Sequence, residues 1–150
     1  EMAIARGAGT EIIRCHHFNT VDSTTSTAIE GVQHHIYTVL SVIVYVQAIQ
    51  AAGNWVTMHL TGYETKAGTS AQSIYIFQQD MQLDQTYVWN DKFSFNGYEP
   101  TDFTGPLDSV AKQDAIADQG SSVPQYLRLF TQHADDSFDV TVTFIDQNNA

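Results

Sequence analysis

The chain has 150 residues, a length that fits one domain, and its hydrophobic fraction of 43% is enough for one ordinary core. Six Lys and Arg stand against 17 Asp and Glu, so the formal net charge is −11. The cations are scattered along the chain, whereas a phosphate backbone requires clustered positive charge and an acidic surface repels anionic lipid. We therefore predict that neither nucleic acid nor a membrane is a partner.

The N-terminal region predicts an arm followed by a strand. Residues 1–10 are rich in glycine and alanine, and we expect them to form a flexible arm. Glu11 to His17 predicts the first strand. Cys15 is the only cysteine, so an internal disulfide is impossible, and we expect a small buried hydrophobic residue there.

Alternation of apolar and polar residues with period 2 dominates the rest of the chain. In the clearest case Phe138, Val140, Val142 and Phe144 form one face of a strand, and Asp139, Thr141 and Thr143 form the other. A strand of this kind is half-buried, with its apolar face on the core. Similar segments occur at Val56–Thr61, Ser73–Phe77, Tyr87–Trp89, Phe93–Phe95 and Leu127–Leu129, whereas Val32–Ala48 is too long for one usual strand and should bend near Thr38 or split.

Turn residues separate these segments. Asn90-Asp91 lies between two of them at a spacing that predicts a tight hairpin, and Asp135-Asp136 predicts a hairpin turn with solvated carboxylates. The whole pattern predicts a single domain over residues 1–150. Its fold class is an all-β, antiparallel, jelly-roll-like β-sandwich of about eight strands.

One long segment interrupts the pattern. Residues 99–124 contain all three prolines together with many Asp, Gly and Ser residues. Leu107, Val110, Ala111 and Ile116 give this segment a weak helical period, and Pro106 suits a first helical turn. We predict a protruding insertion that carries one short helix.

The histidines do not predict a metal site. His16-His17 and His34-His35 are adjacent pairs on predicted strands, and neighbouring strand residues point to opposite faces. Two arrangements stay open: one member of each pair meeting across strands, or three subunits sharing a histidine on a symmetry axis. Bound metal would indicate a cupin-like metalloenzyme.

Motifs for nucleophilic catalysis and for phosphate binding are also missing. We predict no cofactor, no catalytic residue and no enzymatic activity.

Aromatic residues on the outer faces of strands are the remaining candidates for function. Such residues fit a protein interface, a core buried on both sides, or a platform that stacks against sugars. The candidate interface residues, with others from the arm and the insertion, are Ile4, Arg6, Trp55, Tyr63, Tyr87, Trp89, Tyr98, Phe103 and Leu107.

The order of these strands resembles that of small β-sandwich virion proteins of tailed bacteriophages, of the head decoration or cement type. The segments that carry the resemblance are His35–Val39, Ser41–Val44, Trp55–Leu60, Gln85–Gly97, Tyr126–Thr131 and Phe138–Asp146.

The resemblance implies a structural protein on the capsid surface that assembles in the host cytoplasm. It also implies a homo-oligomer, often a trimer, bound to the major capsid protein or to other virion subunits. The alternative is a lectin-like or receptor-binding module of a phage tail or fibre.

Overall fold

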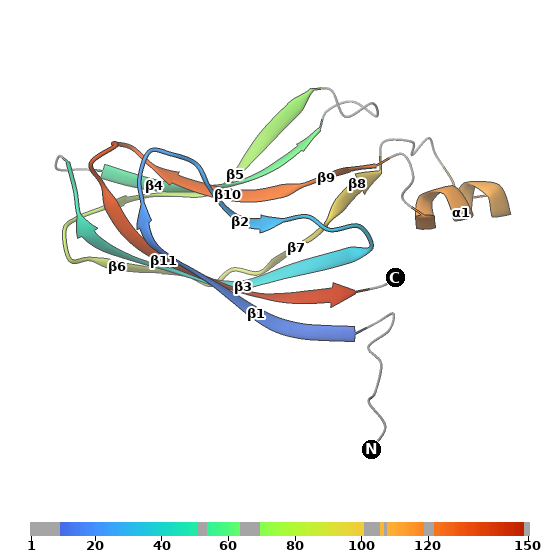
Figure 1. Cartoon of the computed structure of the whole chain (residues 1–150), viewed down its shortest axis with the longest axis horizontal. Helices are drawn as coiled ribbons and strands as arrows, with labels where there is room; N and C mark the ends of the chain where they lie inside the picture. The colour runs from blue at the N-terminus through green and yellow to red at the C-terminus, as the bar shows by residue number, and fades with distance from the viewer. Residues whose placement is uncertain are drawn as a thin grey trace, which may run out of the picture.

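The computed structural model describes residues 10–50, 54–63, 70–100, 106, 108–118 and 122–148. Two antiparallel sheets pack face to face as two layers, with a small ribbon and one helix at one end (Figure 1). This arrangement confirms the predicted all-β sandwich. The arm, with Ile4 and Arg6, lies outside the described residues except for Thr10.

Sheet A has the strand order β1-β11-β3-β6, and β7 pairs with β3 on the side where β6 lies. Its strands are β1 (Thr10–Val21), β3 (His35–Ala48), β6 (Thr86–Trp89), β7 (Phe93–Asn96) and β11 (Ser137–Asn148). Sheet B has the order β2-β10-β4-β5 and consists of β2 (Ser26–Glu30), β4 (Asn54–Tyr63), β5 (Ala71–Met81) and β10 (Tyr126–Thr131).

The core lies between the sheets and follows the period-2 pattern of the sequence. On β11, Phe138, Val140 and Val142 are at most 1% exposed, and they face Met58 and Leu129 of sheet B, which are equally buried. Each fully buried side chain of this size contributes about 1.5–3 kcal/mol of hydrophobic free energy. The alternation read from the sequence therefore provides most of the stabilisation.

The segment predicted to bend or split forms one strand, β3, which is 14 residues long. Its register with β11 shifts between Val39 and Ser41, so Leu40 is the extra residue of a bulge. The strand begins at His35. His34 lies in the preceding turn with φ of 67°, so the prediction that His34 belongs to a strand was wrong.

The predicted hairpin at Asn90-Asp91 is also wrong. β6 pairs with Val42–Tyr45 and β7 pairs with Ile36–Val39, so both lie along β3 and neither pairs with the other. The polar residues between them interrupt one edge of sheet A instead of reversing the chain.

Asp135-Asp136 connects β10 of sheet B with β11 of sheet A, so it is not a hairpin turn. Asp136 is not solvated either, because it is only 2% exposed. Its carboxylate accepts hydrogen bonds from the backbone N–H of Gln50 and of His133, both at 3.0 Å, and from the side-chain amide of Asn54. This buried carboxylate holds together two of the connections between the sheets.

Three connecting segments meet where the sheets adjoin the insertion. The N–H of Gly31 donates to the carbonyl of Gln125, the N–H of Gln125 donates to the carbonyl of Gly97, and the N–H of Gly97 donates to the carbonyl of His35, each at 2.8 Å. A Cβ atom on Gly31 would lie 1.9 Å from the Gly97 carbonyl oxygen. Only glycine allows the backbones to approach this closely.

The described part of the segment predicted as an insertion contains the helix α1 (Val110–Asp118), and its two ends contribute to a two-stranded ribbon, β8 (Tyr98–Pro100) with β9 (Ser122–Pro124). The predicted short helix is thus present. It starts after Ser109, whose hydroxyl accepts a hydrogen bond from the N–H of Lys112 at 3.2 Å, and not at Pro106. Phe103 and Leu107 lie outside the described residues. Within the described ranges, no helix is long and apolar enough to cross a membrane.

The Asp136 contacts predict a large difference between two adjacent acids. Asp136→Ala leaves three donors without their acceptor, each costing about 1–3 kcal/mol where it stays buried. Asp135→Ala should change stability by less than about 0.5 kcal/mol, because the Asp135 side chain is exposed. Urea denaturation of both variants measures the difference, and equal losses would contradict the assigned role of Asp136.

Candidate interaction surfaces

The outer face of sheet B carries a group of aromatic and cationic side chains. Because Val56 and Met58 of β4 and Leu127 and Leu129 of β10 point into the core, the residues that alternate with them point outward. We call this group the aromatic face, and it consists of Trp55 and His59 from β4, Tyr75 from β5, and Tyr126, Arg128 and Phe130 from β10.

The rings of the aromatic face contact one another edge to face. The Phe130 ring centroid lies 5.5 Å from that of Trp55 and 5.6 Å from that of His59, and the His59 ring lies 6.0 Å from that of Tyr75. The Arg128 Cζ lies 4.2 Å from the centroid of the Tyr126 ring, a cation–π contact. These contacts fix the side chains in a defined arrangement on the surface.

His59 is the buried centre of the aromatic face and is only 7% exposed. Its Nδ1 is buried and has no hydrogen-bond partner among the described residues. Burial, and to a lesser degree the charge of Arg128, lower the pKa of His59 below its usual 6.5. The imidazole is therefore neutral at neutral pH, and Arg128 is the cation of the aromatic face.

The candidate residues from the sequence fall into three groups. Trp55 and Tyr63 lie on the outer face of sheet B, half-buried, and Tyr98 is half-buried at the start of β8. Tyr87 and Trp89 point into the core, where the Phe77 ring lies 5.4 Å and 6.2 Å from theirs. These two side chains therefore lie on the inner face of sheet A, and β6 is not buried on both faces, because Val88 between them is exposed.

Of the six residues of the aromatic face only Trp55 is among the candidates from the sequence, and the other five are His59, Tyr75, Tyr126, Arg128 and Phe130. Tyr126, Arg128 and Phe130 alternate with the core leucines of β10, so their outward direction could be predicted. Their position beside Trp55 and His59 could not, because β10 pairs with β4 across more than 60 residues of chain.

A second polar group lies at the inner side of sheet A, where β1 begins and β11 ends. Asp146 of β11 is 5% exposed. Its carboxylate forms a hydrogen bond with Nδ1 of His35 in β3 at 2.6 Å and an ion pair with Nη1 of Arg14 in β1 at 2.9 Å. The Arg14 guanidinium also lies 5.6 Å from the centroid of the Phe144 ring. Asp146 therefore connects three adjacent strands through their side chains.

A phenol close to this group is also buried. Burial and the charge of Asp146 raise the pKa of Tyr37 to about 12. The hydroxyl stays protonated, and its oxygen accepts a hydrogen bond from the N–H of Val32 at 3.2 Å.

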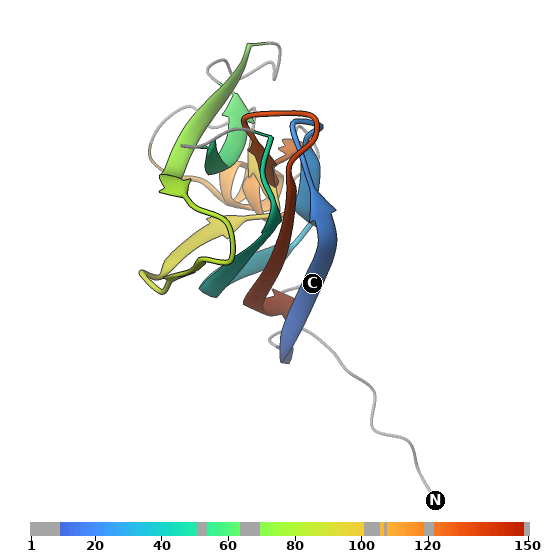
Figure 2. The same cartoon turned by 90° about the vertical axis from the view of Figure 1, so that its left-hand side faces the viewer.

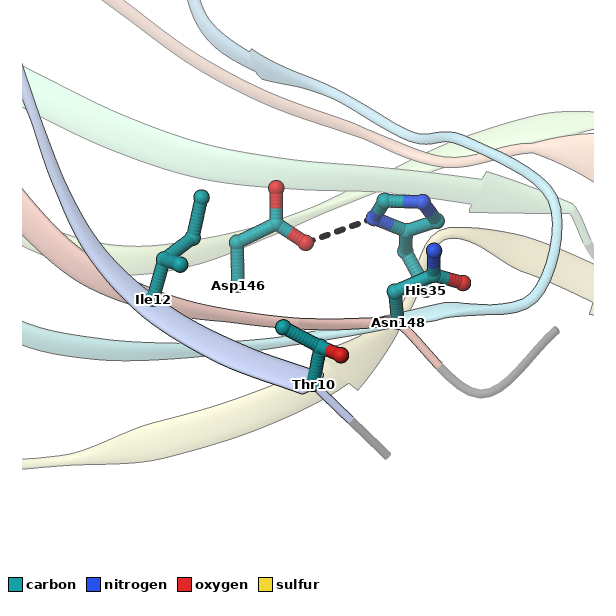
Figure 3. A pocket seen from close by; sticks show the side chains of 5 residues that line it. All are labelled: Thr10, Ile12, His35, Asp146 and Asn148. Carbon is teal, nitrogen blue, oxygen red and sulfur yellow. Dashed lines mark hydrogen bonds and ion pairs between the residues drawn. The ribbon is translucent and has the colours of Figure 1, made fainter. Parts of the chain in front are cut away.

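A pocket of about 140 Å³ opens beside Asp146 and is lined by Thr10, Ile12, His35, Asp146 and Asn148 (Figure 3). In Figure 3 the His35 ring and the Asp146 carboxylate point toward each other across the pocket. A histidine oriented by a carboxylate can act as a base, but a base needs a nucleophile to activate. Thr10 supplies the only hydroxyl among the lining residues. The contact shown by the structure is the one between His35 and Asp146, which links β3 to β11.

The two histidines of β1 lie on opposite faces of the strand, and Cys15 is on the face of His17. His16 contacts the carbonyl of Ala28 at 3.0 Å, and His17 contacts the Thr141 hydroxyl at 2.7 Å on the other face. Among the described residues, no group of three or more His, Cys, Asp or Glu could hold a metal ion. Cys15 is exposed, so the expectation that it is buried was wrong.

Comparisons with known proteins give only loose structural similarity. No family model and no curated protein matches the sequence. A chain of the disulfide-linked pili of Bacillus endospore appendages is 10% identical, with a TM-score of 0.42 over 100% of this chain and 98% of that one. A chain of infectious bursal disease virus, Gx strain, is also 10% identical, with a TM-score of 0.38 over 91% of this chain and 32% of that one. Scores this low carry no argument about function.

The environment of His59 predicts how stability depends on pH. Since its pKa is lowered in the folded state, the unfolded chain binds a proton more readily, and stability is lost as pH falls from 6.5 toward the folded-state value. NMR titration of the His59 ring should give a pKa below 6.5. His59→Gln should reduce the loss of stability between pH 7.5 and pH 5, and an ordinary His59 pKa would contradict the prediction.

Proposed function

We propose that the protein is a non-enzymatic structural protein of a virion, a capsid decoration protein that binds the major capsid protein through the aromatic face. The observation that carries the proposal is this outward group of Trp, Tyr, Phe and Arg side chains. Tyr75 is 62% exposed, and the Trp55, Tyr126, Arg128 and Phe130 side chains are half-buried.

The composition of the aromatic face is that of a protein-binding hot spot. Trp, Tyr and Arg are enriched among the residues that dominate binding energy. Trp and Tyr bury large areas with little loss of conformational entropy. The edge-to-face contacts of Trp55 and His59 with Phe130 already restrict the side chains, so less freedom is lost on binding. A preorganised surface of this kind favours a stable attachment.

The charge of the chain supports a position outside a DNA-filled shell. A formal net charge of −11 keeps the protein soluble and away from nucleic acid. Arg128 gives the aromatic face a cation within this acidic surface, so an acidic group on the capsid protein is the complementary partner for it.

A lectin-like module is the second candidate, because Trp55 and Tyr75 could stack against sugar rings. Trp89 cannot serve in this way, because it is only 9% exposed and packs in the core. Glycan binding that Trp55→Ala abolishes would favour this candidate, whereas glycan binding is not expected of a decoration protein.

Co-sedimentation with shells assembled from the major capsid protein of the same virus tests the proposal. Trp55→Ala and Arg128→Ala should each weaken binding by about 2 kcal/mol or more, roughly 30-fold, if they are hot-spot residues. Val88→Ala is the control, since Val88 is 53% exposed on the outer face of sheet A. Equal binding by all variants would exclude the aromatic face as the attachment surface.

We infer that the N-terminal arm and the insertion, residues 99–124, provide further contacts with neighbouring subunits. Deletion of Met2–Gly9 should lower the amount of protein that sediments with the shells while the thermal midpoint stays unchanged. Unchanged binding would show that the arm is not a contact element.

A further inference from the structure

We propose that two copies of the chain associate through the free edge of β1, in an antiparallel and symmetric strand pair that joins their A sheets. The aromatic face lies on sheet B, so this contact is separate from the proposed attachment to a shell.

β1 is an edge strand without the usual protection. Among the described residues it has a paired strand on one side only, β11, and in Figure 2 it forms the outer margin of its sheet. It is 12 residues long and contains neither proline nor glycine. Natural edge strands are usually short, bulged, covered or highly charged, because unpaired N–H and C=O groups otherwise recruit another strand.

The other edges of the two sheets match β1 poorly. The edge formed by β6 and β7 is interrupted at residues 90–92, and β2 has five residues and an irregular register. The bulge at Ile76 divides β5 into two short runs. Residues Thr10 to Phe18 of β1, in contrast, pair with β11 without any shift. The best match for this uninterrupted edge is a second copy of itself.

The charges of β1 permit self-association. Two chains with a net charge of −11 repel each other over most of their surfaces. In β1, Glu11 is the only acid and Arg14 the only permanently charged base, and the Arg14 charge is compensated by Asp146. An antiparallel arrangement also brings Glu11 of one copy toward the half of β1 in the other copy that contains His16 and His17.

The surface beside the edge can accept side chains of the second copy. Ile13 is 72% exposed and Ile12 is 42% exposed. A hollow of about 290 Å³ is lined by Glu11, Ile12, Ile13 and Ile145, and Ile12 also lines the pocket beside Asp146. In strand addition the backbone bonds give affinity, and hollows that receive alternate side chains give specificity. Antiparallel pairing places the half of the partner strand with His17 and Phe18 beside these hollows.

Sedimentation equilibrium of purified protein measures the association. Wild-type protein should form dimers, and Ile13→Lys should weaken them by about tenfold or more, since lysine on an edge strand opposes strand addition. Ile43→Lys is the matched control, because Ile43 is 42% exposed on the same face of sheet A but lies in β3, an interior strand. A monomer at all concentrations, or equal effects of the two substitutions, would overturn the proposal.

The exposed thiol of Cys15 can show whether the β1 edges of two chains lie side by side, because Cys15 lies near the middle of the part of β1 that pairs without a register shift. A short bismaleimide should link two wild-type chains through Cys15. It should not link chains with Cys15→Ser and Thr86→Cys, which carry the thiol on the opposite edge of sheet A. Linkage of only the second protein would show that another edge is used.

Trp55→Ala and Ile13→Lys together separate this proposal from the proposed function. Trp55→Ala should weaken shell binding and leave the dimer unchanged. Ile13→Lys should weaken the dimer and leave the contact of each copy with the shell unchanged. Loss of the dimer in Trp55→Ala would assign self-association to the aromatic face. If deletion of Met2–Gly9 abolishes the dimer and Ile13→Lys keeps it, self-association belongs to the arm.

Discussion

The pairing of β11 with β1 on one side and with β3 on the other is the constraint on which the rest of the structure depends. β1 has β11 as its only strand neighbour among the described residues, and β11 supplies Phe138, Val140, Val142 and Phe144 to the core. A shift of one residue in either register would turn this apolar row outward. At the end of the row the Asp146 carboxylate receives Arg14 from β1 and His35 from β3, so the three strands are fixed by side chains as well as by backbone.

The elements that could be predicted from the sequence are those in which local pattern and burial agree. The alternation of Phe138 to Phe144 marks a half-buried strand whatever its neighbours are, and it also places Asp146 on the core face, two residues beyond Phe144. A carboxylate in such a position must be neutralised or paired, which is the signal that the sequence analysis did not use. Its partners lie more than 100 residues away, so the pattern alone could not identify them.

Two predictions from the sequence were wrong because residues typical of hairpin turns do not form hairpins in this fold. Asn90-Asp91 and Asp135-Asp136 have turn composition, but the first interrupts an edge and the second connects two sheets. Local propensity indicates where a chain changes direction. It does not indicate with which strand the following strand pairs, because that depends on the topology of the sheets. Cys15 was expected in the core because cysteine is usually buried, yet edge position exposes both faces of β1.

Symmetry connects the two proposed surfaces. Two antiparallel edge strands related by a two-fold axis require that axis to be perpendicular to the sheet, because any other two-fold axis would make them parallel or separate them. Such an axis keeps the inner faces of both A sheets on the same side, and both B sheets then lie on that side too. The two aromatic faces of a dimer would therefore point in one direction, toward one partner surface. Two linked contacts bind a regular array with an avidity that can exceed the single affinity by about 10²–10⁴, which permits each aromatic face to be of modest size.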